Sequence, residues 1–166
     1  MKKHLLIAAT LTALAGSEAL AGTHILSASA TVTLVVLPSY ALTKVQNLNF
    51  GTVAQGGSSV TILAQSSANA AYFTLAGAPH NQSITITWSA TDLTKTGASN
   101  ITWTPTVFAG STGTQGSSSQ ILSSGNTSTT DGSGNLWIWV GGSTATIGGL
   151  QVPGTYGATF TLSVDY

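Results

Sequence analysis

The sequence predicts an all-β protein with the architecture of a β-sandwich. Apolar and polar residues alternate with a period of two along most of the chain after residue 21, which is the pattern of strands with one buried face. Clusters of glycine, serine and proline separate these segments, and no window after residue 21 shows the 3.6-residue period of a helix. About eight to ten short strands joined by such turns are typical of a sandwich or a barrel, and we favour the sandwich.

The individual strands follow in chain order. The longest alternation runs from Leu26 to Val36 and ends before Pro38, which cannot continue a ladder. Pro105 interrupts a later strand and indicates an edge or a bulge there. The remaining strands are expected at 40–50, 60–64, 71–75, 84–88, 101–107, 136–140, 144–147 and 156–166.

Two of these regions differ from the rest. The apolar run 136–140 lies between glycine-rich turns, so we expect it to be a central strand. Gly110 to Gly134 is dominated by serine, threonine and glycine, and we expect it to be a long, mobile surface excursion.

The first 21 residues have the pattern of a secretory signal peptide. A basic start at Lys2 precedes an uncharged, mostly apolar run over 5–15 and a small-x-small triplet at 19–21. A buried N-terminal helix is the alternative interpretation. Eleven residues are too few to cross a bilayer, and no later stretch is long and apolar enough. We therefore expect an exported protein without a membrane span, whose mature chain begins at Gly22.

Charged side chains are rare in the mature chain. Lys44 and Lys95 stand against Asp92, Asp131 and Asp165, so two positive and three negative charges give a formal net charge of −1. This balance excludes nucleic acid as an expected partner and provides no polybasic patch for anionic lipid. A nearly uncharged surface also lacks the repulsion that keeps proteins monomeric, which favours assembly.

Residues that carry chemistry are equally sparse. The chain has no cysteine, and only His24 and His80 remain after the expected cleavage, so we expect no metal site and no cofactor. Asp131 begins a turn that loosely resembles a calcium loop but lacks its other carboxylates, and a plain turn is the better interpretation. No G-x-S-x-G elbow or phosphate-binding loop is present, so we expect no enzyme, although a nucleophile hidden among the serines is a third alternative.

The tryptophans raise a second function. Trp137 and Trp139 are two residues apart and therefore share one face of a strand, where they would form a platform for a sugar ring. The alternative is that the aromatic side chains fill the core or a subunit interface.

The alternating segment 26–36 is the most informative one for function. It is either the first strand of its own sandwich or a donor strand that completes the sheet of a neighbouring subunit. In the second case the donor side chains would contribute roughly 1.5–3 kcal/mol for each large apolar group buried, and head-to-tail addition would generate a filament. The expected donor residues are Leu26, Ala28, Ala30, Val32 and Leu34.

The order of several short motifs resembles a family of exported bacterial proteins known as a domain of unknown function. That family looks like the fimbrial (pilin) subunits of the chaperone–usher kind, in which a C-terminal strand ends in an aromatic residue twelve positions after a glycine. Gly154 and Tyr166 have this separation, although the aromatic residue is the last one here rather than the penultimate one. The disulfide of many fimbrial subunits is missing. The motifs are 28–32 before Pro38, 48–51, 72–77, 140–142 and 153–157.

The resemblance implies an immunoglobulin-like sandwich over 38–166, preceded by the extension 22–37 with the donor strand. The acceptor groove would be bordered by the terminal strand and lined by Phe160, Leu162, Val164 and Tyr166. The implied protein is a structural subunit of a surface filament. Its partners would be further copies of itself, together with a periplasmic chaperone and an outer-membrane usher during transit through the periplasm. A monomeric exported carbohydrate-binding or adhesin module is the alternative.

Overall fold

The computed structural model describes residue 31, residues 33–34 and residues 39–166. The chain divides into two units, Met1–Leu37 and Pro38–Tyr166. The expected signal peptide and the donor residues Leu26, Ala28, Ala30 and Val32 lie outside the described residues. Leu34 is described and is 73% exposed.

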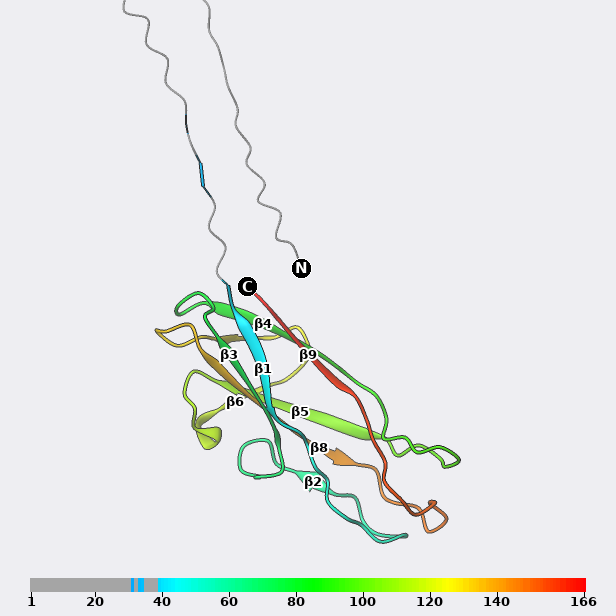
Figure 1. Ribbon diagram of the computed structural model, residues 1–166. Coiled ribbons are helices and arrows are strands. Elements are labelled where there is room, and N and C mark those ends of the chain that lie inside the picture. Colours follow the sequence, from blue (N-terminus) through cyan, green and yellow to red (C-terminus); the bar gives the residue numbers. More distant parts are fainter. Residues whose placement is uncertain (1–30, 32, 35–38) are drawn as a thin grey trace, which may run out of the picture. The chain divides into compact units, whose positions relative to one another are not determined.

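The second unit is an all-β sandwich of two antiparallel sheets, as the alternation predicts (Figure 1). The first sheet has the strand order β1-β3-β8-β5-β6, with β2 also paired to β8, and the second has the order β7-β4-β9. The strands are β1 (Ala41–Gln46), β2 (Thr61–Ile62), β3 (Ala71–Ala76), β4 (Ser83–Ala90), β5 (Trp103–Gly110), β6 (Ser119–Ile121), β7 (Thr127–Thr129), β8 (Leu136–Thr144) and β9 (Phe160–Asp165). No helix among the described residues is long and apolar enough to span a membrane.

The core lies between the inward faces of the two sheets. Alternate residues of β3 and β8 face Ile84 and Ile86 of β4, and these side chains are almost fully buried. Partly buried apolar side chains of β1, β4 and β9 pack around the same cluster. The buried cluster consists of Ala71, Phe73, Leu75, Ala78, Ile84, Ile86, Val107, Ala109, Ile121, Leu136, Ile138 and Val140.

The apolar run at 136–140 forms the central strand that its composition predicts. β8 pairs with β3 on one side and with β5 on the other, and most of its residues are buried. Pro105 lies opposite Gly142 of β8, whereas β6 pairs only with residues 107–109 of β5. The proline therefore occupies the part of β5 that has no second neighbour, where a missing N–H disrupts no ladder.

The region 110–134, expected to be a long surface excursion, contains secondary structure that its composition did not indicate. This region contains a short 3-10 helix, η1 (Gln115–Ser117), followed by β6 in the first sheet and β7 in the second. Ile121 is buried in the core, and the Thr130 hydroxyl donates to the carbonyl of Pro79 at 2.7 Å. The segment is thus the crossover that closes one side of the sandwich. Its polar composition conceals this, because short strands bury only a few side chains.

Several strand boundaries also differ from the alternation. β8 ends at Thr144, so 144–147 is not a separate strand, and of 60–64 only Thr61–Ile62 forms a strand. β9 begins at Phe160 rather than at Tyr156. Gly154 has a φ of +139°, which only glycine adopts without strain, and Gly157 forms an isolated bridge to Thr94. The chain therefore turns before it enters the sheet.

Candidate functional site

The two sheets remain open along one side of the sandwich. β1 is the outer strand of the first sheet and pairs only with β3, and β9 is the outer strand of the second sheet and pairs only with β4. Among the described residues, no ladder joins β1 to β9. Two rows of backbone N–H and C=O groups therefore face the gap between the sheets.

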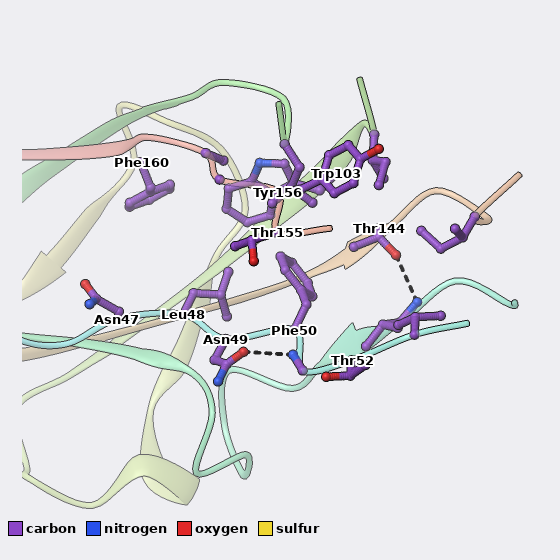
Figure 2. Close-up of a pocket in the computed structure, with 18 of the residues that line it drawn as sticks. Asn47, Leu48, Asn49, Phe50, Thr52, Trp103, Thr144, Thr155, Tyr156 and Phe160 are labelled. Carbon is purple, nitrogen blue, oxygen red and sulfur yellow. Dashed lines mark hydrogen bonds between the residues drawn. The ribbon is translucent and has the colours of Figure 1, made fainter. Parts of the chain in front are cut away.

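A groove with a volume of about 1160 Å³ opens along this side, at the end where β1 leaves its sheet and β9 enters its own (Figure 2). Its lining comes from the segment after β1, from the turn region before β9 and from the core strands. The apolar lining includes Leu48, Phe50, Phe73, Leu93, Ile101, Trp103, Val140, Ile147, Val152 and Phe160.

A cluster of aromatic side chains lies in the lining of the groove. The ring of Trp103 lies 5.6 Å from that of Phe50 and 6.2 Å from that of Phe160, measured between centroids. Phe160 of the second sheet also lies 6.4 Å from Phe73 of the first. The indole N–H of Trp103 donates to the carbonyl of Thr91 at 2.7 Å, so its ring is fixed within this cluster. The rings bridge the two sheets where no ladder does.

Hydrogen bonds from amide side chains fix the walls of the groove. The Gln46 amide donates to the carbonyl of Ala70 at 3.0 Å, which holds the end of β1 against the loop before β3. On the other wall, the Gln151 amide donates to the Tyr156 hydroxyl at 2.8 Å, and that hydroxyl donates to the carbonyl of Val152 at 2.7 Å. These side chains are used within the fold, so the free surface of the groove is mainly apolar.

An aromatic contact closes the opposite end of this side. The rings of Tyr40, just before β1, and Tyr166, just after β9, meet edge to face with centroids 5.4 Å apart. Since β1 starts and β9 ends at this contact, the two strands run in opposite directions along the opening (Figure 1). We call this end of the sandwich the tyrosine pole.

The expected acceptor residues all lie on this open side. Phe160 lines the groove, and Leu162 and Val164 continue along β9 as partly buried side chains packed on the core. Tyr166 is at the tyrosine pole and is 49% exposed. The alternation of β9 thus gives one apolar face toward the core and one polar face toward solvent.

The two free edges differ in how well they could accept a strand. Lys44 lies opposite Phe73 in the β1–β3 register, so it is on the inward-facing side of β1 although its side chain is exposed, and the register shifts between Lys44 and Gln46 as at a bulge. An inward charge and a bulge are the features that block edge-to-edge pairing. β9 pairs with β4 over six consecutive residues without a register shift and carries no lysine. β9 is therefore the more receptive edge.

The sequence did not single out the other half of the groove. Lys44 and Phe50 are close in the sequence, but Trp103 is more than fifty positions later and meets Phe50 only in the folded chain. The nearest signal was the motif at 48–51, which contains Leu48 and Phe50. The groove has two ionisable side chains, Lys44 and Tyr156. They provide neither a carboxylate pair nor a nucleophile with its base.

The tryptophan pair does not form an open platform. Trp139 is 5% exposed, and its ring stacks on Tyr72 at 5.3 Å with an interplanar angle of 15°. The Gln115 amide donates to the carbonyls of Ala64 and Ser67, which ties together two loops beside this outer face of the first sheet. Burial raises the pKa of the Tyr72 hydroxyl. This packing supports the interpretation of the aromatic side chains as structural.

The remaining candidates are isolated. His80 is exposed, and His24 lies outside the described residues. The Asp131 carboxylate accepts hydrogen bonds from the backbone N–H groups of Asn135 (2.7 Å) and Ser133 (2.8 Å), which makes the segment the plain turn expected. The Asn135 N–H is the main cause of a lowered pKa for Asp131. No group of three metal-ligating side chains occurs among the described residues.

Comparisons with protein-family models, with curated proteins and with solved structures find no match to this chain.

Proposed function

We propose that this protein is a structural subunit of an extracellular filament of the pilus or fimbria type, assembled by strand addition between subunits. The observation that carries the proposal is the open side of the sandwich, where β9 has an unpaired edge and its first residue, Phe160, lines an apolar groove of about 1160 Å³. A single added strand would pair with β9 and cover the apolar side chains at once.

The extension before the sandwich has the composition that such a strand needs. Leu26, Ala28, Ala30, Val32 and Leu34 alternate with polar residues, so one face of the extended segment is apolar. Leu34 is 73% exposed, which leaves its side chain free to contact another surface. The few charges of the chain add little repulsion between subunits.

The fold also favours addition at one site only. β6 and β7, the outer strands on the other side of the sandwich, have three residues each and are joined by the crossover at 122–126. β1 is blocked by its bulge and by Lys44. This leaves β9 as a regular edge, and one donor and one acceptor edge in each subunit give a linear polymer.

The resemblance to chaperone–usher fimbrial subunits leads to the same proposal. An open apolar groove would need cover before assembly, and a periplasmic chaperone followed by an outer-membrane usher would supply it. The implied location is the periplasm in transit and then the cell surface.

The test uses a full-length variant with a disabled donor, Val32→Asp/Leu34→Asp, which we call the donor-blocked chain. We expect the wild type to form filaments visible by negative-stain electron microscopy and an unboiled-gel ladder that collapses on boiling. The donor-blocked chain should be exported but remain monomeric, and a synthetic peptide of residues 24–36, the donor peptide, should bind to it. Unchanged filaments in the donor-blocked chain would refute the proposal.

A further inference from the structure

The end of the sandwich opposite the tyrosine pole carries an exposed apolar patch. Leu150 is in the turn at 149–150, Val53 comes just before the neighbouring turn at 55–56, and Val152 follows the first of these turns. Leu150 is 98% exposed, whereas Val53 and Val152 are 36% and 38% exposed. We call these three residues the leucine tip.

The two turns form one built surface. The backbone N–H of Gly56 donates to the carbonyl of Gly148 at 3.3 Å, and the N–H of Ile147 donates to the carbonyl of Gly57 at 3.1 Å. The Gln55 side chain also donates to the carbonyl of Gln151. The tip is therefore held by hydrogen bonds between segments that are about ninety residues apart in the sequence.

The leucine tip is continuous with the mouth of the groove. Val53 and Val152 line the groove and are exposed beside it, and Figure 2 shows the neighbouring Phe50, Thr155 and Tyr156 facing the same space. In Figure 1 the turns that carry the tip are at the far end of the sandwich from the start of β1 and the end of β9. A strand that occupies the groove must leave it at one of these two ends.

The donor segment lies just before Tyr40, so the tyrosine pole of the donating subunit must be close to the end of the groove at which the donor leaves the acceptor. Tyr40 is six positions after Leu34, so at most about 20–22 Å of extended chain lies between the donor and the tyrosine pole of the subunit that supplies it. A donor that leaves beside Val53 and Val152 brings the tyrosine pole of its own subunit to the leucine tip. That contact is head to tail, so it can repeat from subunit to subunit. A donor that left the groove at the acceptor's tyrosine pole would instead bring two tyrosine poles together, and the two subunits would form a closed dimer.

Resting on the proposed function, we propose that the leucine tip binds the tyrosine pole of a second copy of this chain, the copy whose donor strand fills the groove. The two surfaces are of matching character, since Tyr166 is 49% exposed and apolar side chains make up the tip. The contact fixes one subunit against the next, so that the filament is a stiff rod rather than a chain of flexibly tethered domains.

Crosslinking tests this contact directly, because the chain has no cysteine of its own. In the double variant Leu150→Cys/Tyr166→Cys, the two thiols of one chain lie at opposite ends of the sandwich, separated by at least the ~20 Å length of β9. A short bis-maleimide can therefore join them only between subunits. Leu122→Cys/Tyr166→Cys is the matched control, since Leu122 is also exposed (78%) but lies in the crossover between β6 and β7.

We expect filaments of the Leu150 variant to give a boiling-resistant ladder and those of the Leu122 control to give little. We also expect Leu150→Asp to raise the critical concentration for assembly about tenfold, because the contact would lose the burial of one leucine side chain. Leu122→Asp should leave the critical concentration unchanged. Both Asp substitutions should leave donor-peptide binding to the donor-blocked chain unchanged.

Each outcome decides the inference. Filaments in which the Leu150 and Leu122 variants crosslink and assemble alike would overturn the contact while the proposed function stands. A wild type that binds the donor peptide but forms only monomers or closed pairs would also overturn it. If the donor-blocked chain does not bind the donor peptide and the wild type forms no filament, the proposed function and the inference fail together.

Discussion

The sharpest prediction concerns the two faces of β9. Leu162 and Val164 point toward the core and the open side, whereas Thr161 and Ser163 point to solvent on the same strand. If a donor strand covers the open side, truncation of the first pair must weaken its binding and truncation of the second pair must not. A double variant of the inward-facing pair and one of the solvent-facing pair therefore differ only in which face of β9 they change.

The magnitude follows from what each side chain still exposes. Complete burial of a side chain of this size contributes ~1.5–3 kcal/mol. Leu162 and Val164 are already partly buried in the free subunit, so the donor covers only the surface that is still exposed. This leaves roughly 0.5–1 kcal/mol for each residue. Leu162→Ala/Val164→Ala should then raise the Kd of the donor peptide about five- to thirtyfold, and Thr161→Ala/Ser163→Ala should change it less than about twofold.

The assay is the fluorescence anisotropy of labelled donor peptide titrated with the donor-blocked chain that carries either pair. Thermal unfolding of each variant, followed by circular dichroism, checks that the acceptor is folded at the titration temperature. Equal losses for the two pairs, or a larger loss for the solvent-facing pair, would refute the assignment of this face as the acceptor.

Three further predictions test Lys44 in the groove and the turn at 131–134. Lys44→Val should tighten donor-peptide binding about fivefold by anisotropy, because it removes a charge from the inward face of an edge strand; weaker binding would contradict this role. Gly134→Ala should destabilise the fold by about 2 kcal/mol or more in urea titrations, since Gly134 has a φ of +78° and an added Cβ would lie 1.9 Å from a backbone oxygen. Gly132→Ala is its control, because nothing lies within 4 Å there, and equal effects would exclude the clash as the cause. Asp131→Ala should lower the Tm at neutral pH. Because the pKa of Asp131 is lower in the folded state than in the unfolded state, its carboxylate stabilises the fold at pH values above the unfolded pKa. The Tm difference between the variant and the wild type should therefore shrink as the pH falls through the folded-state pKa. A Tm difference that does not change with pH would contradict this role of the carboxylate.

Local sequence determined the fold class and most of the strands, because a strand with one buried face requires alternation wherever it lies. The run at 136–140 was recognisable as a central strand since both of its faces are covered, and Pro105 was recognisable as a position without a second neighbour. The inward face of β9 was also predictable, as Phe160, Leu162 and Val164 alternate with polar residues. These features depend only on near neighbours in the chain.

Tertiary structure alone decided the site. Whether β6 and β7 form within a serine-rich segment, and which strand edges stay unpaired, depends on partners far away in the sequence. Phe50, Trp103 and Phe160 meet only because two sheets pack face to face, and their sequence positions contain no sign of that contact. Alternation specifies the face that a strand buries but not which of its two edges stays unpaired, so only the assembled sheets show where a further strand can be added.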